Sequence, residues 1–395
     1  ASGWLSWGWK EELPSSVWDD YKVLFHELLP RVCKKMDPNR FYWPSSPGHS
    51  IELPETDQIY GSGDNHYWGV WHGGDDFSAF EENIGRFLSE YGMQSFPELK
   101  TIMTFAIEKD LDIESEVMKA RQKASLGTGN LIQYIENYFS KPKDFNSTVL
   151  LSQVMQAFAI KTAVEIHRRS MPFCMGTLYW QFNDCWPAIS WSSLDYYGNW
   201  KALHYHAKRF FNPIIITIHE VDGFVNINVV NDQFKKVEAM ISLQLFSLDS
   251  TIVKEESIQL KIQQASSHCV KKIDKNKFLK GYNPSDVFLH TEIVSSGNRV
   301  CQNNYFFVRP KELNLPENNF YSEVCKDDAT VSIHIKATSF IYQLHILCNN
   351  TSGTFSDNYF DMLAGEEVTL YFTPEKESVD FAFDFSINTL QSLIN

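Results

Sequence analysis

The chain has 395 residues, of which 43% are hydrophobic and 21% charged, a balance typical of globular proteins. That length exceeds what one hydrophobic core usually organises, so we expect two or three domains. The formal net charge of −14 would repel phosphates, which disfavours nucleic acid as a partner. No run approaches the roughly 20 consecutive apolar residues of a membrane-spanning helix. We therefore expect a soluble chain that partners neither nucleic acid nor a membrane.

The first 212 residues alternate helical patterns with short apolar runs, as β/α proteins do. Helices are predicted from Val17 to Met36, from Asn146 or Ser147 to about Arg169, and from Trp200 to Phe211. Four apolar runs are predicted strands, at residues 39–44, 66–71, 87–92 and 174–181. Four strands separated by helices make half of an eight-stranded β/α-barrel of the TIM type, and we predict such a half barrel in residues 1–212.

After Pro213 the pattern changes to alternating, β-branched runs without helices, which is typical of β-sandwiches. A connector with two prolines, residues 309–316, separates two sets of such runs. We predict one β-sandwich in residues 213–310 and a second in residues 311–395. The predicted fold class is α/β followed by all-β.

Cysteine and histidine spacing gives no sign of a metal site. The seven cysteines are an odd number, and none forms a CxxC or another ligand spacing. No cluster of His, Asp and Glu has ligand spacing either. We predict free or buried thiols and no metal.

Two features point to carbohydrate chemistry in the first 200 residues. All 11 tryptophans lie there, and an indole ring can stack on a sugar face as well as fill a core. Glu90 ends a predicted strand among apolar neighbours, and a carboxylate at the C-terminal end of a barrel strand points into the active site. The pattern alone leaves open whether Glu90 is a catalyst or a buried ion-pair partner.

Four segments spread along the chain carry a resemblance to a known family. They are residues 86–97 (RFLSEYGMQSFP), 176–187 (GTLYWQFNDCWP), 191–205 (WSSLDYYGNWKALHY) and 355–360 (FSDNYF). They resemble, in order, the nucleophile segment, the last barrel strand with its continuation, and a C-terminal motif of glycoside hydrolase family 2, in its β-mannosidase branch. The resemblance implies the second half of a catalytic barrel followed by two immunoglobulin-like sandwiches.

The resemblance also implies a retaining mechanism with two carboxylates, in which Glu90 matches the nucleophile. Family members carry the acid/base in an Asn-Glu pair shortly before a segment like residues 4–10, and no such pair occurs here. Glu11 and Glu12 lie downstream of that segment and are interpreted as solvated charges. We expect the acid/base just before Ala1, so that this chain alone is inactive and the missing N-terminal half is its partner.

Several aromatic and polar side chains match family positions near the sugar. Each of them has packing in the core as its alternative role. The candidate substrate-binding residues are Trp180, Trp68, His66, Trp7, Asp64 and His72.

The expected function is exo-hydrolysis of terminal β-D-mannose from the non-reducing ends of β-mannoside oligosaccharides, without a cofactor. Two alternatives stay open: a non-catalytic carbohydrate-binding or scaffold protein, and a relative of the β-galactosidase or β-glucuronidase type. The sequence does not determine whether the parent protein is periplasmic, secreted or lysosomal.

Overall fold

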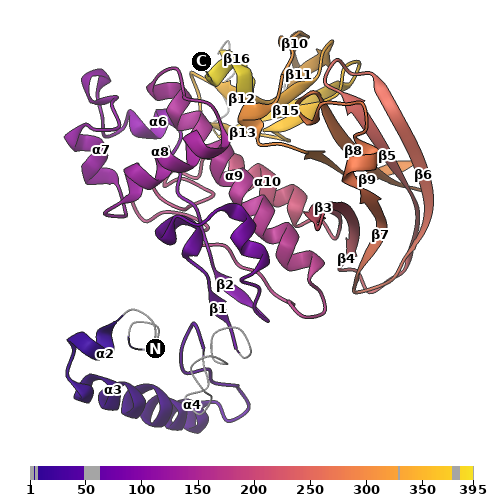
Figure 1. Ribbon diagram of the computed structural model, residues 1–395. Coiled ribbons are helices and arrows are strands. Elements are labelled where there is room, and N and C mark those ends of the chain that lie inside the picture. Colours follow the sequence, from indigo (N-terminus) through magenta and orange to yellow (C-terminus); the bar gives the residue numbers. More distant parts are fainter. Residues whose placement is uncertain (1–3, 5–7, 49–62, 328–329, 376–382, 395) are drawn as a thin grey trace. The chain divides into compact units, whose positions relative to one another are not determined.

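A computed structural model describes residues 4, 8–48, 63–327, 330–375 and 383–394 (Figure 1). The chain divides into two compact units. One comprises residues 1–92 and 166–180, and the other comprises residues 93–165 and 181–395.

The first unit begins with a long helix. A short helix, α2 (Trp9–Glu12), precedes a continuous helical run made of α3 (Ser15–Lys22), a π-helical stretch (Val23–Leu28) and α4 (Leu29–Met36). This run matches the helix predicted from Val17 to Met36. Its apolar residues stay exposed, including Val17 at 40% and Val23 at 53%. The strand predicted at residues 39–44 is wrong, because this segment is a turn followed by irregular chain and pairs with no strand in the described part of the chain.

Three short segments of the first unit run parallel to one another. Strand β1 (Asn65–His66) pairs with β2 (Leu88–Glu90), and Leu88 also forms a parallel bridge with Thr177 on its other side. The strand predicted at residues 174–181 is therefore reduced to one bridge. The run predicted as a strand at residues 66–71 turns after His66 into a tight π-helical turn, Gly69–Gly73. Within that turn the buried Trp71 has a φ of +89°, a conformation that a bulky residue rarely adopts.

The second unit carries most of the helices. They are α6 (Leu99–Ile102), α7 (Glu116–Arg121), α8 (Gly127–Tyr138), most of α9 (Phe145–Arg169), α10 (Ala202–Phe210), and the short α11 (Lys275–Phe278) and α12 (Leu390–Leu393). Short 3-10 helices cover Phe77–Glu81 of the first unit and Glu108–Asp110, Pro284–Asp286 and Pro310–Glu312 of the second.

Helix α9 is the core helix of this part of the chain. It begins at Phe145, one or two residues before the predicted start at Asn146 or Ser147, because the Asp144 carboxylate caps it by accepting the backbone N–H of Ser147 at 2.7 Å. By length and composition α9 could cross a membrane, but 78% of its most apolar window is buried within the protein. Its apolar character therefore serves packing.

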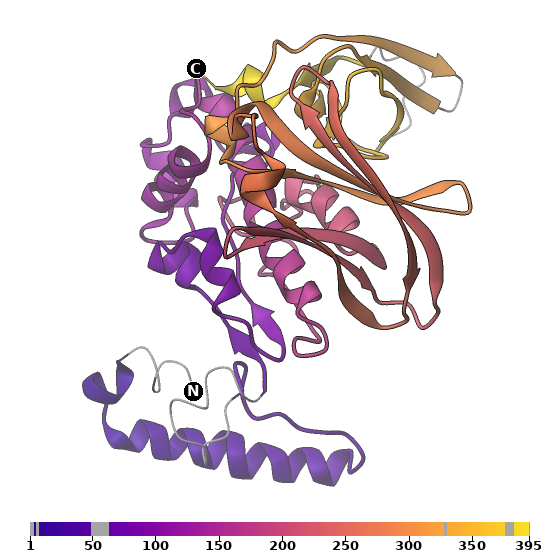
Figure 2. The same ribbon diagram turned by 45° about the vertical axis from the view of Figure 1, so that its right-hand side comes forward.

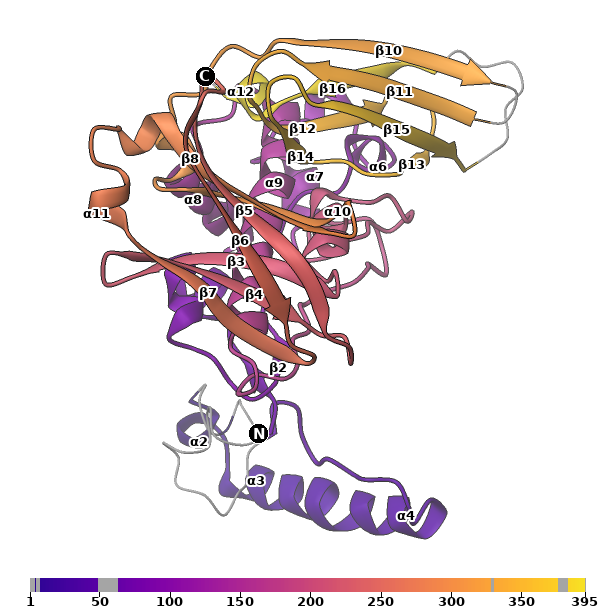
Figure 3. The same ribbon diagram turned by 90° about the vertical axis from the view of Figure 1, so that its right-hand side faces the viewer.

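The first β-sandwich has a three-stranded sheet ordered β3-β4-β7 and a four-stranded sheet ordered β6-β5-β8-β9, facing each other in Figure 3. Side chains from both sheets, such as Ile227, Ile241 and Leu289, are fully buried in one cluster between them. The strands are β3 (Ile214–Val221), β4 (Phe224–Asn231), β5 (Val237–Ser247), β6 (Ile252–Ile262), β7 (Ser266–Asp274), β8 (Val287–Ser295) and β9 (Asn298–Phe306).

The second β-sandwich has sheets ordered β10-β11-β15-β13 and β14-β12-β16. Along β11, Val331, Ile333 and Ile335 are buried while the residues between them are more exposed, the alternation of a strand with one face in the core. The strands are β10 (Phe320–Asp327), β11 (Thr330–Ala337), β12 (Ile341–Cys348), β13 (Gly353–Phe355), β14 (Phe360–Met362), β15 (Glu367–Pro374) and β16 (Phe385–Asn388). Figure 2 shows the purple and magenta helices α6 to α9 on one side of the second unit and the strands of both sandwiches on the other.

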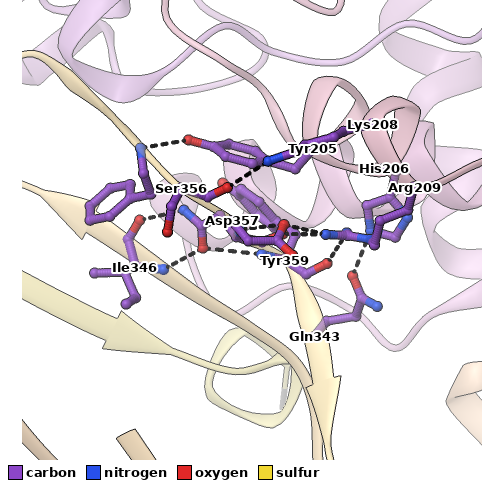
Figure 4. A network of polar contacts seen from close by, with 11 residues as sticks. Tyr205, His206, Lys208, Arg209, Gln343, Ile346, Ser356, Asp357 and Tyr359 are labelled. Carbon is purple, nitrogen blue, oxygen red and sulfur yellow. Dashed lines mark hydrogen bonds and ion pairs between the residues drawn. The ribbon is translucent and has the colours of Figure 1, made fainter. Parts of the chain in front are cut away.

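Helix α10 is tied to the second sandwich by a polar network (Figure 4). The Arg209 guanidinium donates to the Asp357 carboxylate at 2.5 Å and to the carbonyls of Asn358 and Tyr359 at 3.1 and 2.5 Å. Lys208 donates to the Ser356 carbonyl at 2.9 Å. Charge-assisted hydrogen bonds of this kind are the stronger ones, and a planar guanidinium can reach several acceptors at once.

We expect Arg209→Ala to lower the free energy of unfolding by about 2 kcal/mol, because the Asp357 carboxylate and two carbonyls lose their donor. Urea unfolding at constant ionic strength measures the change. The neighbouring Lys208→Ala, which removes a single contact, is the matched control and should cost well under half as much. Equal losses in the two variants would contradict the role assigned to Arg209.

Candidate active site

Glu90 is the last residue of β2, at the C-terminal end of a strand flanked on both sides by parallel neighbours. Its side chain is 27% exposed. Oε2 lies 3.2 Å from Nδ1 of His66 and accepts the indole N–H of Trp68 at 3.4 Å. Burial raises the pKa of Glu90 above its ordinary value, the Trp68 hydrogen bond opposes this rise, and the nearby charge of Asp64 adds to it. The carboxylate is thus held by two donors and still reaches solvent.

Asp64 is held as an anion by four donors. Its carboxylate accepts hydrogen bonds from the hydroxyls of Ser46 and Ser89, both at 2.5 Å, from the Gly48 N–H at 2.6 Å and from the Trp43 indole at 3.2 Å. Burial by itself would raise the pKa of Asp64, but these hydrogen bonds together keep it below its ordinary value. A carboxylate held in this way is a poor proton donor at neutral pH.

His66 lies between the two carboxylates. Its Nδ1 faces Glu90, while its Nε2 lies 3.1 Å from the Ser46 hydroxyl and 3.8 Å from the Asp64 carboxylate. The imidazole is therefore fixed at both nitrogens, with its side chain only 13% exposed. A ring fixed at both ends can hold the Glu90 carboxylate in one orientation.

The structure brings together four of the seven predicted site residues: Asp64, His66, Trp68 and Glu90. The exposed His72 packs its ring against Trp68 at a centroid distance of 5.2 Å, and burial lowers the pKa of His72. Trp180 is 43% exposed and donates its backbone N–H to the carbonyl of Tyr91, the residue after Glu90, at 2.8 Å. Trp7 lies outside the described residues.

Sequence reasoning missed the partners of Asp64. Ser89 directly precedes Glu90 in the same strand, and its hydroxyl donates to Asp64. This contact was predictable only in that Ser89 and Asp64 lie in or beside two strands that were expected to be neighbours. Trp43 and Ser46 sit in an irregular segment, and no periodic pattern marks their partner. Only the fold brings that segment to Asp64.

Buried contacts of Tyr91, the residue after Glu90, hold the end of β2 in place. The Tyr91 hydroxyl lies 2.6 Å from Oγ1 of Thr177, which in turn lies 2.8 Å from Nδ1 of His167. The rings of Tyr91 and His167 meet edge to face at 4.9 Å. Burial lowers the pKa of His167 to about 3, so the imidazole is neutral. This buried contact sets the position of the strand that carries Glu90.

In the second unit, a buried lysine joins the segments that follow Glu90 and Trp180 in the chain. Ser95 and Ser190 form an antiparallel bridge, and the Lys201 ammonium donates to both of their carbonyls, at 3.4 and 3.5 Å. Lys201 is fully buried, and burial lowers its pKa to about 8 against the opposing attraction of Asp184 and other carboxylates. Asp184 accepts the hydroxyls of two serines at 2.7 Å, a structural role.

Glu98 interacts electrostatically with Asp195 and Lys201, and its partial burial raises its pKa to about 7. A carboxyl whose folded-state pKa is raised stabilises the protein fully below its ordinary pKa of 4.5, and this contribution is lost as pH rises through about 7. Between pH 4.5 and pH 7.5 the free energy of unfolding should fall by about 2 kcal/mol less in Glu98→Gln, which cannot titrate, than in the unsubstituted chain. The full linkage effect would be larger, but the partial exposure of Glu98 reduces it. Urea unfolding at both pH values measures the two changes in free energy. An equal fall in Glu98→Gln and in the unsubstituted chain would refute the prediction.

No group of three or more His, Cys, Asp or Glu side chains able to hold a metal occurs among the described residues. None of the seven cysteines, which all lie in the described part of the chain, forms a disulfide.

Comparison with known proteins places these features in a family context. Residues 223–312 match the family model described as a mannosidase Ig/CBM-like domain, and residues 315–393 match an Ig-fold domain model. The chain is 27% identical to rat (Rattus norvegicus) β-mannosidase over 95% of this chain and 46% of the relative, and 34% identical to Aspergillus niger β-mannosidase B over 50% of this chain and 24% of the relative.

Solved structures give the same picture. The β-D-mannosidase of Dictyoglomus thermophilum superposes with a TM-score of 0.81 at 28% identity, over 93% of this chain and 44% of that one. The exo-chitosanase CsxA of Amycolatopsis orientalis, at 16% identity with a TM-score of 0.62 over 78% of this chain and 42% of that one, shares the fold. The rat, mouse and goat β-mannosidases match 91–95% of this chain, and the chain spans 43–46% of their length.

Proposed function

This chain belongs to the C-terminal region of the β-mannosidases of glycoside hydrolase family 2, and from that premise we propose that Glu90 is the nucleophile of a retaining exo-β-mannosidase. The supporting observation is the position of Glu90, at the C-terminal end of a parallel strand with its carboxylate held by His66 and Trp68. In this proposal β1, β2 and the Thr177 segment are neighbouring strands in the second half of a β/α-barrel. The barrel part ends at residue 212, and the sandwiches occupy residues 213–310 and 311–395.

Each group near Glu90 has a task in the proposed reaction. The Glu90 carboxylate attacks the anomeric carbon of a terminal mannose, the bond to the leaving oxygen breaks, and a mannosyl ester forms. An acid/base carboxyl protonates the leaving oxygen and later removes a proton from the water that hydrolyses the ester. Asp64 is a poor candidate for that task because its hydrogen bonds lower its pKa. The acid/base is proposed to lie in the N-terminal half of the complete enzyme.

Trp180 is proposed to bind the sugar, and His66 and Trp68 are proposed to orient Glu90; none of the three is proposed to transfer protons. His66, fixed on Asp64 and Ser46, and Trp68 together point one oxygen of Glu90 in a set direction. Trp180 presents a partly exposed indole on the neighbouring segment, where a sugar face can stack on it.

Covalent labelling tests the nucleophile directly. With 2-deoxy-2-fluoro-β-mannosyl fluoride the leaving group is fluoride, which needs no acid catalyst, while the fluorine at C2 slows hydrolysis of the ester. We expect one adduct on the longest native form of the protein by intact mass, and peptide mapping should locate it on Glu90. Glu90→Gln is the control that must lose the label. An adduct on another carboxylate, or none on folded full-length protein, would contradict the assignment.

The sugar identity is proposed from the β-mannosidase relatives. A panel of nitrophenyl β-glycosides tests it on the complete enzyme. We expect the β-mannoside to have the highest kcat/KM, and faster turnover of the β-galactoside or β-glucuronide would replace mannose by that sugar.

A further inference from the structure

The second unit contains a cavity of about 410 Å³ that the proposed reaction does not use. Its walls come from three places: Glu98 to Met103 in and around α6, the segment from Asn199 to Tyr205, and the inner strands and loops of the second sandwich from Ile346 to Tyr359. Figure 4 shows three of its lining residues, Tyr205, Ile346 and Tyr359, where α10 meets that sandwich. The volume lies within the range of small-molecule sites, about 300 to 1,000 Å³.

One residue of the cavity wall, Asn199, holds a buried hydrogen-bond acceptor that has no donor among the described residues. Asn199 is only 5% exposed, and its Nδ2 donates to Asp195 at 3.0 Å and to Thr101 at 3.1 Å, which fixes the orientation of the amide. Its Oδ1 is buried and has no partner among the described residues. A buried acceptor without a donor costs about 1–3 kcal/mol, and a ligand hydroxyl that reached Oδ1 would recover that free energy.

The other polar groups of the cavity balance in charge. Glu98 and Lys100 both line it, and the two groups attract each other. Burial raises the pKa of Glu98 to about 7, so that its carboxyl can donate or accept a hydrogen bond near neutral pH. With one carboxyl and one ammonium, the cavity favours neither an anion nor a cation. A neutral ligand with several hydroxyls fits it best.

The remaining walls are aromatic and apolar. Trp200 and Tyr205 lie side by side with ring centroids 5.0 Å apart, and Met103, 48% exposed, stands at the rim. An aromatic wall facing polar groups suits a molecule with one apolar C–H face and an edge of hydroxyls, which describes a pyranose ring.

We propose that this cavity is a second carbohydrate site, which binds a pyranose residue through Trp200, Asn199 and Glu98. This inference rests on the proposed function only for the choice of mannose as the sugar. The site takes part in binding and leaves the chemistry at Glu90 unchanged. Its occupant would be either released mannose or a terminal mannose unit of an oligosaccharide.

Ligand-observed saturation-transfer NMR of the full chain with millimolar D-mannose tests the site. Trp180→Ala removes the sugar contact proposed near Glu90, and we expect mannose binding to persist in that variant. Added to that background, Trp200→Ala should weaken binding at least tenfold. Met103→Arg should do the same by filling the cavity from its exposed rim, where the substitution leaves the core intact. The matched control is Trp186→Ala, which removes an exposed indole that lies between Arg121 and Lys123 and does not line the cavity.

The outcomes separate this inference from the proposed function. If mannose binding survives Trp180→Ala and disappears with Met103→Arg, the second site stands, whether or not Glu90 is labelled by the fluoro sugar. If Glu90 is labelled but mannose binding in the Trp180→Ala background is absent, or is unchanged by both cavity variants, the second site is refuted and the proposed function survives. Replacement of free mannose by a mannobiose in the same titration distinguishes the two sources, since a tenfold preference for the disaccharide indicates an oligosaccharide end.

Discussion

Replacement of Glu90 by glutamine in the complete enzyme should lower turnover of a nitrophenyl β-mannoside by about four orders of magnitude or more. The amide keeps the shape and both donor contacts of the side chain, but it cannot form the mannosyl ester through which the reaction is proposed to pass. Steady-state kinetics measure the loss. Glu116→Gln is the matched control, because this glutamate is 93% exposed on α7 and should be silent.

A rescue experiment makes the same prediction sharper. Glu90→Ala opens space at the α-face of the sugar, and azide can attack the anomeric carbon there in place of the carboxylate. We expect azide to restore part of the turnover and to give α-mannosyl azide as the product, identified by NMR. Retained activity in Glu90→Gln, or rescue that gives the β-azide, would reject Glu90 as the nucleophile.

His66→Asn should have a smaller effect, on kcat more than on KM. The ring touches Glu90 and not the sugar in our proposal, so its loss frees the orientation of the carboxylate. Misplacement of a reacting group by about 1 Å costs on the order of 10²-fold, and a tenfold to hundredfold fall in kcat follows. An effect confined to KM would instead mean that His66 binds the substrate directly.

The parts of the site that could be predicted from sequence depend on neighbouring residues in the chain, and the other parts depend on distant ones. Glu90 could be placed from sequence because a short apolar run ended by a glutamate and a glycine is a local signal. The sandwich strands were predictable for the same reason, as the alternation along β11 shows. The strand predicted at residues 66–71 ends at His66, because the apolar residues of this run suit a strand while the backbone at Trp71 takes a positive φ that no periodic pattern reveals.

Tertiary contacts account for the rest. The anionic state of Asp64 depends on Ser46, Trp43 and Gly48, which lie 16 to 21 residues earlier in a segment without regular structure. Lys201 is a stronger case, since a lysine just before a helix is usually a solvated charge, yet here it is fully buried. Sequence alone gave no sign of the carbonyls and carboxylates that surround it.

Replacement of Lys201 by methionine should lower the free energy of unfolding by about 3–5 kcal/mol. The two side chains have similar length, so packing is largely kept, but the bridge between Ser95 and Ser190 loses the ammonium that binds both of its carbonyls. The carboxylates of Asp184 and Asp195, both buried, lose the cation that faces them. Removal of one member of a buried charge pair lowers the stability strongly, because the other charge stays buried without compensation. Urea unfolding at pH 7 measures the loss, and Lys161→Met, at a lysine whose side chain is 31% exposed, is the control.

A double variant separates charge compensation from packing. If Lys201 acts through its charge, adding Asp184→Asn to Lys201→Met removes a carboxylate that the first change left uncompensated, and the double variant should be more stable than Lys201→Met alone by about 1 kcal/mol or more. If Lys201 only fills space, Asp184→Asn should add its own cost, since it weakens the hydrogen bonds from Ser190 and Ser192. A double variant less stable than either single variant would therefore reject the electrostatic role, and the segment after Glu90 would owe its position to packing instead.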